Sequence, residues 1–210
     1  MSDITAVINL HAEGALAQAA FRSTARAKAF AESRGLSVEV LAVLDRPDAA
    51  TLEFAKQCDL VEFTALQVDL GDIGSARNAG AAAARGEWLS FLDGDNLWAE
   101  NWLVAAHAAA VKDSRSIVWR PQVRLGFGTH SDLFICVDME DADYDLLNLS
   151  MANHWPQLCF ARRSLFLEIP YPKTDLARHI GYEDWAWNIE TVARGCIHKI
   201  VPDTVYARRA

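Results

Sequence analysis

The stretch SARNAGAAAARGEWLSFLDGDN, residues 75–96, contains two different sequence patterns. Residues 75–85 are rich in alanine, the strongest helix former, and Gly86 follows them. Residues 88–92, WLSFL, form a short apolar run that is typical of a buried strand. That strand ends on Asp93-Gly94-Asp95-Asn96, so a buried strand delivers two carboxylates at its tip. The stretch therefore predicts an α/β unit whose carboxylates need an explanation.

The rest of the chain continues the alternation of strand and helix. Strands are predicted at residues 4–10, 37–44, 60–68 and 88–92, and helices at 13–33, 48–57, 75–85 and 99–112. Strands that alternate with helices predict βαβ crossovers and a mainly parallel sheet. We therefore expect an α/β fold with a Rossmann-like, mainly parallel central sheet and flanking helices. Because no Pro/Gly/Ser linker divides the chain, we expect a single domain over residues 1–210.

The second half of the sequence is less regular. Strands are predicted at residues 116–126 and 157–162, a helix at 175–193, and one or two closing strands at 196–207. Between the first two strands lies an acidic, irregular segment, SDLFICVDMEDADYDLLNLSMANHW, residues 131–155. Segments of this length and irregularity are often lids or substrate-binding loops.

Composition excludes several classes of protein. The 210 residues carry a formal net charge of -8, which disfavours nucleic acid as a partner because phosphate binding requires a basic face. The four cysteines form no CxxC pair, which disfavours a zinc site and favours a reducing, cytoplasmic setting. We expect no signal peptide, and no transmembrane segment because no apolar run approaches ~18 residues.

Polar residues follow three of the predicted strands. They are Asn9-Leu10-His11, Asp45 and Asp93-Gly94-Asp95. Ligands gather at the carboxyl ends of the strands in such sheets, so one edge would bring these residues together. Asp93 and Asp95 have two explanations. They form a hydrogen-bonded turn, or they converge on a divalent cation, which prefers oxygen ligands.

Four segments in this order resemble the motifs of family 2 glycosyltransferases with the GT-A fold. They are NLHAEG (9–14), LDRPD (44–48), the block at 75–96 and GYEDW (181–185). The resemblance is strongest over residues 74–103 and weak over 120–155. It implies an inverting enzyme that transfers a sugar from a nucleotide-diphosphate donor to an acceptor hydroxyl. It also implies a nucleotide-sugar-binding half at residues 1–98 and an acceptor-binding half at 99–210.

The resemblance assigns the donor and metal roles to the first half. Asp95 would bind Mg²⁺ or Mn²⁺ directly, and Asp93 would reach the ribose or the metal. Arg77 would contact the nucleotide or its phosphates, although a surface pair with Asp72 is the alternative. Gly80 would let the helix and the sheet approach closely.

The first two loops depart from the family pattern. Asn9 and His11 occupy the usual proline and tyrosine positions, where His11 would stack on or hydrogen-bond the base unless it is purely structural. Asp45 occupies the position of the family's nucleotide-binding aspartate, and the alternative is a carboxylate that only turns the chain. Arg46-Pro47-Asp48 replaces the usual sequence after it.

The resemblance assigns the acceptor side to the second half. Asp184 would be the catalytic base that takes the proton of the acceptor hydroxyl, with a helix-start carboxylate as the alternative. Glu183 and Trp185 would bind the acceptor. His179 and His198 are candidates for metal ligands or for core residues, and neither has a partner at a suitable spacing.

The expected function is polysaccharide or glycoconjugate synthesis by a metal-dependent transferase. The acceptor would be a saccharide, a lipid-linked molecule or a protein, and the enzyme would be cytoplasmic, with possible docking on the inner face of the membrane or on a partner protein. Two alternatives stay open. One is a catalytically inactive domain that binds sugar or protein. The other is a nucleotidyltransferase, which is disfavoured because the loop LHAEGALAQ (10–18) has no Lys or Arg.

Overall fold

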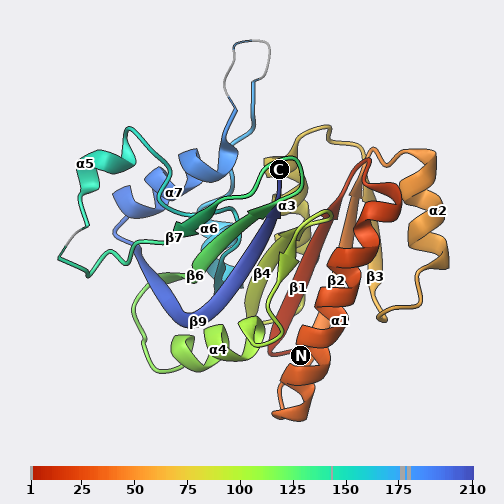
Figure 1. Ribbon diagram of the computed structural model, residues 1–210, viewed down its shortest axis with the longest axis horizontal. Helices are drawn as coiled ribbons and strands as arrows, with labels where there is room; N and C mark the ends of the chain where they lie inside the picture. The colour runs from red at the N-terminus through yellow and green to blue at the C-terminus, as the bar shows by residue number, and fades with distance from the viewer. Residues whose placement is uncertain (1, 143, 176–177, 179–180) are drawn as a thin grey trace.

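The computed structural model describes residues 2–142, 144–175, 178 and 181–210 (Figure 1). The strands are β1 (Ile4–Leu10), β2 (Val38–Asp45), β3 (Thr64–Val68), β4 (Trp88–Asp93), β5 (Leu97–Trp98), β6 (Ile117–Phe127), β7 (Leu133–Ile135), β8 (Phe160–Arg162) and β9 (Ile197–Arg209). The helices are α1 (Ala17–Ser33), α2 (Ala49–Gln57), α3 (Ile73–Ala83), α4 (Trp102–Ala110), α5 (Leu146–Leu149), α6 (Arg163–Glu168) and α7 (Glu183–Ala193), and a 3-10 turn, η1 (Gly14–Leu16), precedes α1.

One sheet runs through the molecule in the order β3-β2-β1-β4-β8-β6-β9-β5, and β7 pairs with β6. Strands β1, β2, β3 and β4 pair in parallel with one another, as βαβ crossovers require. In the second half, β8 runs antiparallel to β4 and β6, while β6 and β9 are parallel to each other. The predicted α/β fold is confirmed, and the second half makes the complete sheet mixed.

Helices cover both faces of the sheet (Figure 1). Helices α1 and α4 pack on one face and α3, α6 and α7 on the other, each with its own apolar core. In β1, Ile8 belongs to the first core and Val7 to the second, as the alternation of a strand buried on both faces demands. Gly80 brings α3 close to the sheet, because an added Cβ there would lie 2.9 Å from Val7 Cγ1. The predicted close approach of helix and strand is confirmed.

Several element boundaries differ from the sequence-based prediction. Strand β3 begins at Thr64 and not at residue 60. The apolar side chains among residues 60–63 pack on the first core, and pairing with β2 begins only at Thr64. Helix α7 begins at Glu183 and not at residue 175, since Tyr182 adopts a left-handed backbone with φ 59° that a right-handed helix cannot include. Helix α3 begins earlier than predicted because Asp72 caps it. Residues 197–209 form one long strand.

A third, smaller apolar cluster holds the acidic segment 131–155 against the rest of the domain. It consists of Cys136, Leu149 and Trp155, with the half-buried Trp185 packed on them. His198 is fully buried behind this cluster, as expected for a core histidine, and His179 lies outside the described residues. No helix in the described ranges is long and apolar enough to cross a membrane.

Candidate active site

The carboxyl ends of β1 and β4 lie side by side. The strand register pairs Asn9 with Asp93, and the Gly94 N–H donates to the Asn9 carbonyl at 2.9 Å. A Cβ on Gly94 would lie 2.4 Å from Leu10 Cδ2 and 3.0 Å from the Asn9 oxygen. Gly94 is therefore the residue that lets the Asp93-Gly94-Asp95 turn fold back against β1.

Two cavities meet at this edge of the sheet. The first has a volume of about 570 Å³ and is lined mainly by the ends of β1, β2 and β4 and the start of α3. The second has a volume of about 430 Å³ and lies between α7, β6, β9 and residues 153–157. Asp93, Tyr182 and Glu183 line both cavities, so the two cavities adjoin at these residues.

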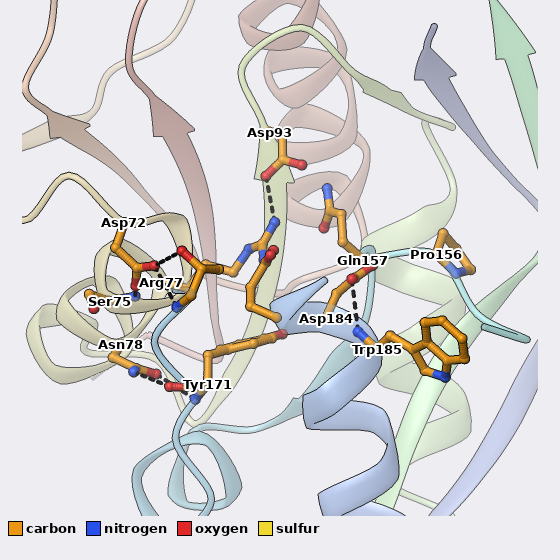
Figure 2. A network of polar contacts seen from close by, with 12 residues as sticks. Asp72, Ser75, Arg77, Asn78, Asp93, Pro156, Gln157, Tyr171, Asp184 and Trp185 are labelled. Carbon is orange, nitrogen blue, oxygen red and sulfur yellow. Dashed lines mark hydrogen bonds and ion pairs between the residues drawn. The ribbon is translucent and has the colours of Figure 1, made fainter. Parts of the chain in front are cut away.

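Arg77 lies at the boundary between the cavities and joins the two halves of the chain (Figure 2). Its guanidinium is 3.0 Å from an Asp93 oxygen and also pairs with Glu183. The ring of Tyr171 lies beneath it, with the guanidinium carbon 5.3 Å from the ring centroid. The side chain is only 2% exposed, and it does not make the surface pair with Asp72 that was the alternative. Arg77 thus contacts Asp93 and Glu183 at the same time.

Negative charge is concentrated at the Asp93-Gly94-Asp95 turn. Burial raises the pKa of Asp95, and the neighbouring charge of Asp93 raises it further. Burial also raises the pKa of Glu13, with Asp95 and Asp93 adding to the effect. A cation bound there would relieve this repulsion. The described residues contain no group of three or more His, Cys, Asp or Glu arranged to hold a metal, so a metal would need oxygen ligands from a bound molecule as well.

Asp45 lines the first cavity, but its oxygens already have backbone partners. One oxygen accepts from the Leu70 and Gly71 N–H groups at 2.7 and 3.0 Å, and the other from Asp72 N–H at 3.0 Å. Its carbonyl lies 2.6 Å from His11 Nδ1, which must therefore be the protonated nitrogen. Asp45 therefore shapes the loop that leads into α3 and orients the His11 ring at the cavity wall.

Asp72 connects the start of α3 with the second half of the chain. Its carboxylate accepts from Ser75 N–H at 2.7 Å, from Thr174 N–H at 2.9 Å and from the Thr174 hydroxyl at 2.6 Å. Burial alone would raise the pKa of Asp72, but these hydrogen bonds outweigh it and lower the pKa to about 2. Ser75, Asp72 and Arg77 appear together in Figure 2.

Asn9 is a buried amide without a partner. Its side chain is 3% exposed, lines the first cavity, and neither amide atom has a hydrogen-bond partner among the described residues. The Nε atom of Arg77 is likewise buried without a hydrogen-bond partner among the described residues. Buried polar groups are normally hydrogen-bonded, so these atoms indicate a site that a polar ligand or water completes.

Asp184 lies in the second cavity only. One of its oxygens accepts from the Trp185 backbone N–H at 2.8 Å (Figure 2). The other accepts from the Asn153 amide at 3.4 Å. Glu183 lines both cavities and is held by Arg77. Trp185 lines neither cavity in the described part of the chain, since its indole N–H donates to the Leu149 carbonyl at 2.7 Å.

Comparison with known proteins identifies the family. The model of "Glycosyl transferase family 2" matches residues 5–169, most of the chain. The chain belongs to glycosyl transferase family 2. Among curated proteins, none matches its sequence.

Solved structures of other glycosyltransferase chains share the fold. The crystal structure of S. aureus TarS 1–349 is 15% identical, with a TM-score of 0.72, and the alignment covers 99% of this chain and 60% of that one. The complex of TarS 1–349 with UDP-GlcNAc is 16% identical, with a TM-score of 0.74 and coverage of 99% and 58%. The complex with UDP is 15% identical, with a TM-score of 0.73 and coverage of 99% and 60%. This family 2 chain therefore spans about three-fifths of the length of those TarS structures.

The structure of this family 2 chain brings most of the predicted site residues together. Asn9, His11, Asp45, Asp93 and Glu183 line the first cavity, and Arg77, Asp93, Glu183 and Asp184 line the second. Sequence reasoning did not find the Asp72–Thr174 connection or the contact of Asn153 with Asp184. For the role of Asp72, the available signal was that this polar residue directly precedes a helix. Asn153 lies in the irregular segment, where the sequence offered none.

Proposed function

We propose that this chain is an inverting, metal-dependent glycosyltransferase that uses a nucleotide-diphosphate sugar. The observation that carries the proposal is the pair of adjoining cavities. They share Asp93 and Glu183, and Asp184 lies in the second only. A donor in the first cavity would place its diphosphate at Asp93 and Asp95, with its sugar directed towards the second. An acceptor in the second cavity would then lie between that sugar and Asp184.

The first cavity has the chemistry of a nucleotide site. His11 and the unpartnered Asn9 amide offer hydrogen bonds to a base or ribose. Arg77, which lines the adjoining second cavity, offers charge to a phosphate at Asp93, where the two cavities adjoin. Asp45 would act mainly by shaping this wall, because its oxygens already accept three backbone hydrogen bonds. We propose a UDP-sugar as the donor, since structures of TarS, which has the same fold, contain UDP and UDP-GlcNAc.

The second cavity has the chemistry of an acceptor site. An acceptor hydroxyl oxygen attacks the anomeric carbon, the bond from that carbon to the diphosphate oxygen breaks, and the hydroxyl proton goes to Asp184. Attack on the face opposite the leaving group inverts the anomeric centre. Glu183 would help to hold the acceptor. Phe134, Trp155 and Tyr182 offer aromatic surface to a sugar ring at this cavity.

A divalent cation fits the turn at the end of β4. Asp95, and Asp93 beside it, would hold Mg²⁺ or Mn²⁺, and their repulsion in the absence of a cation agrees with this. When bound, the cation would neutralise charge that develops on the departing diphosphate. Within the chain itself, Arg77 positions Asp93 from the opposite side.

The acceptor and setting are proposed more broadly. An acceptor hydroxyl on a saccharide, a lipid-linked molecule or a protein would fit, and the activity would serve polysaccharide or glycoconjugate synthesis. The proposed compartment is the cytoplasm, with docking on a membrane surface or a partner protein where the acceptor requires it. Four free cysteines, three of them buried, support a reducing environment. Trp185 would support the acceptor cavity indirectly, because its indole N–H donates to the Leu149 carbonyl.

Calorimetric titration of UDP and GDP tests the donor site. The protein is titrated with each nucleotide in Mn²⁺ and in chelator, as wild type and as Asp95→Ala. We expect metal-dependent binding of UDP that Asp95→Ala weakens at least about tenfold, the size of effect expected for one lost ligand of a bound metal. Asp59→Ala, an exposed aspartate after α2, is the matched control and should bind like wild type.

Other outcomes change the conclusion. Metal-independent binding that Asp95→Ala does not affect would remove the cation from the proposal. Failure of both nucleotides to bind under any metal condition would contradict the UDP donor. Binding of UDP-GlcNAc without any release of UDP, even with saccharide acceptors, would favour a sugar-binding domain.

A further inference from the structure

A chain of polar side chains runs from the buried Arg120 and Asn188 through the partly buried Asn153 to Asp184. It begins at Arg120 on β6, continues through Asn188 on α7 and Asn153 in the irregular segment, and ends at the Asp184 carboxylate. Arg120 is 1% exposed and Asn188 is fully buried. Asn188 lies four residues after Asp184, on the same side of α7.

Arg120 is a buried cation without an acidic partner. No carboxylate lies within ion-pair distance of it among the described residues. Its guanidinium instead donates to the Pro156 carbonyl at 2.8 Å, to the Leu158 carbonyl at 3.2 Å and to the Asn188 side-chain oxygen. Burying a charge in this way is costly, so such a residue is retained where it serves a purpose beyond packing.

The Nε–H donor of Arg120 fixes the state of His198. Arg120 Nε lies 3.3 Å from His198 Nδ1, and His198 Nε2 lies 2.9 Å from the Thr191 hydroxyl. Burial, and then the charge of Arg120, lowers the pKa of His198 well below its ordinary value. His198 is therefore neutral. Its Nδ1 accepts from Arg120 Nε–H, and its Nε2–H donates to the Thr191 hydroxyl.

The direction of every hydrogen bond in the chain follows from Arg120. A guanidinium can only donate, so the Asn188 oxygen must face Arg120 and the Asn188 NH₂ must face Asn153. That NH₂ donates to the Asn153 oxygen at 2.9 Å, and the Trp155 backbone N–H approaches the same oxygen at 3.4 Å. The Asn153 NH₂ is then left to face Asp184, 3.4 Å from its oxygen.

We propose that Arg120, Asn188 and Asn153 form a one-way hydrogen-bond relay that presents an N–H to Asp184. The relay gives the Asp184 carboxylate an N–H partner and fixes its orientation towards the second cavity, where a base must lie to take the proton of an acceptor hydroxyl. These three are positioning residues. This inference rests on the proposed role of Asp184 and adds the means by which the fold prepares it.

Other charged or titratable groups also face Asp184. They are Glu183 on the same helix, Arg77 and Asp93 at the boundary of the cavities, Arg124, Tyr206 and Arg208 across the second cavity, and Arg120 and His198 behind the relay. The relay can be changed without replacing any of them, and Asn153→Ala does so without adding a charge.

Reversing the relay tests it. Asn188→Asp keeps the shape and the Arg120 contact but removes the donor to Asn153, so the Asn153 amide turns its oxygen towards Asp184. Asn153→Ala only deletes the last donor. With UDP-GlcNAc as the probe and water as the acceptor, we expect Asn188→Asp to lower the rate of UDP release about tenfold, a fraction of what a general base contributes. We expect Asn153→Ala to lower it less.

The pH profile separates the relay from a packing role. Asn153→Ala should move the acid limb of the rate profile to higher pH, because Asp184 then loses its N–H partner without any charge being added. Asn188→Asp should move the limb further, since it also turns an oxygen towards Asp184 and adds a carboxylate behind it. Affinity for UDP should stay unchanged, since Asn188 lies outside the first cavity. Thr24→Val, which removes a buried hydroxyl bonded to the Ala20 carbonyl in α1, is the control and should change neither quantity. A milder effect in Asn188→Asp than in Asn153→Ala would overturn the proposal.

A spectroscopic measurement does not depend on turnover. In wild type, the side-chain amide signals of Asn153 should shift as acid protonates Asp184, and Asp184→Asn should abolish that shift. Asn188→Asp should change the direction or size of the shift. Unaltered Asn153 signals in Asp184→Asn would overturn the relay. An intact relay in a protein that never turns over UDP-GlcNAc would count against the proposed donor alone.

Discussion

Thr174 donates both its backbone N–H and its hydroxyl to one oxygen of Asp72, at 2.9 and 2.6 Å. The two residues are 102 positions apart in the sequence. The other Asp72 oxygen accepts from Ser75 N–H at the first turn of α3. One carboxylate therefore caps the helix that carries Arg77 and ties that helix to the segment that leads towards Glu183 and Asp184.

Replacing Asp72 should weaken the fold in a pH-dependent way. Its pKa is lowered to about 2 in the folded protein from 3.8, so its contribution is fully present above 3.8 and is lost as the pH falls through 2. The difference corresponds to about 2 kcal/mol in the free energy of unfolding. Denaturant unfolding of Asp72→Asn should show this loss at pH 7 and a smaller decline than wild type between pH 4 and pH 2.

Asp48 provides the comparison for Asp72. It caps α2 by accepting from Thr51 N–H at 2.7 Å, but it is exposed and makes no tie to the second half of the chain. Asp48→Asn should therefore destabilise the protein less than Asp72→Asn. Equal losses in the two variants would mean that capping alone explains the effect and that Thr174 contributes nothing.

Gly94→Ala should damage the site more than the fold. The added Cβ would lie 2.4 Å from Leu10 Cδ2 and 3.0 Å from the Asn9 carbonyl oxygen, so the turn that carries Asp93 and Asp95 must shift. We expect at least about tenfold weaker Mn²⁺-dependent UDP binding by calorimetry, since a small misplacement of a binding group loses much of its effect. Leu10→Ala combined with Gly94→Ala should recover part of the affinity, because it removes the nearest clash. No recovery would place the obstruction at the backbone oxygen.

Asn9→Leu should separate stability from binding. Both amide atoms of Asn9 are buried without a partner, so an apolar residue of similar size removes a desolvation penalty of about 1 kcal/mol and should not destabilise the protein. The same change removes hydrogen bonds that a nucleotide would use, and UDP affinity should fall about tenfold. Thermal unfolding and calorimetry on one preparation measure both. Lower stability together with unchanged affinity would show that Asn9 serves the fold.

The sequence predicted the first half of the molecule well because local signals and tertiary structure agree there. The run at residues 88–92, apolar except for Ser90, becomes β4, buried on both faces, and the helix predicted at residues 48–57 becomes α2, with Asp48 as its cap. The predicted start of α7 was wrong because Tyr182 adopts a left-handed backbone conformation, which no local sequence pattern marks. The contacts of Asn153 and Asn188 depend on segments that are distant in sequence, so spacing carried no signal for them.

Arg77 offers the most direct test of how the two halves of the site depend on each other. Arg77→Met would leave Asp93 and Glu183 without their shared partner and should lower the free energy of unfolding by about 3 kcal/mol, the low end for breaking a buried pair. Glu183→Gln alone should cost less, because the amide oxygen can still accept from Arg77. Arg77→Met with Glu183→Gln should be more stable than the sum of the single losses predicts, since the most buried unpaired carboxylate is gone. A double-mutant cycle by denaturant unfolding measures this coupling, and strictly additive losses would mean that Glu183 is held by something other than Arg77.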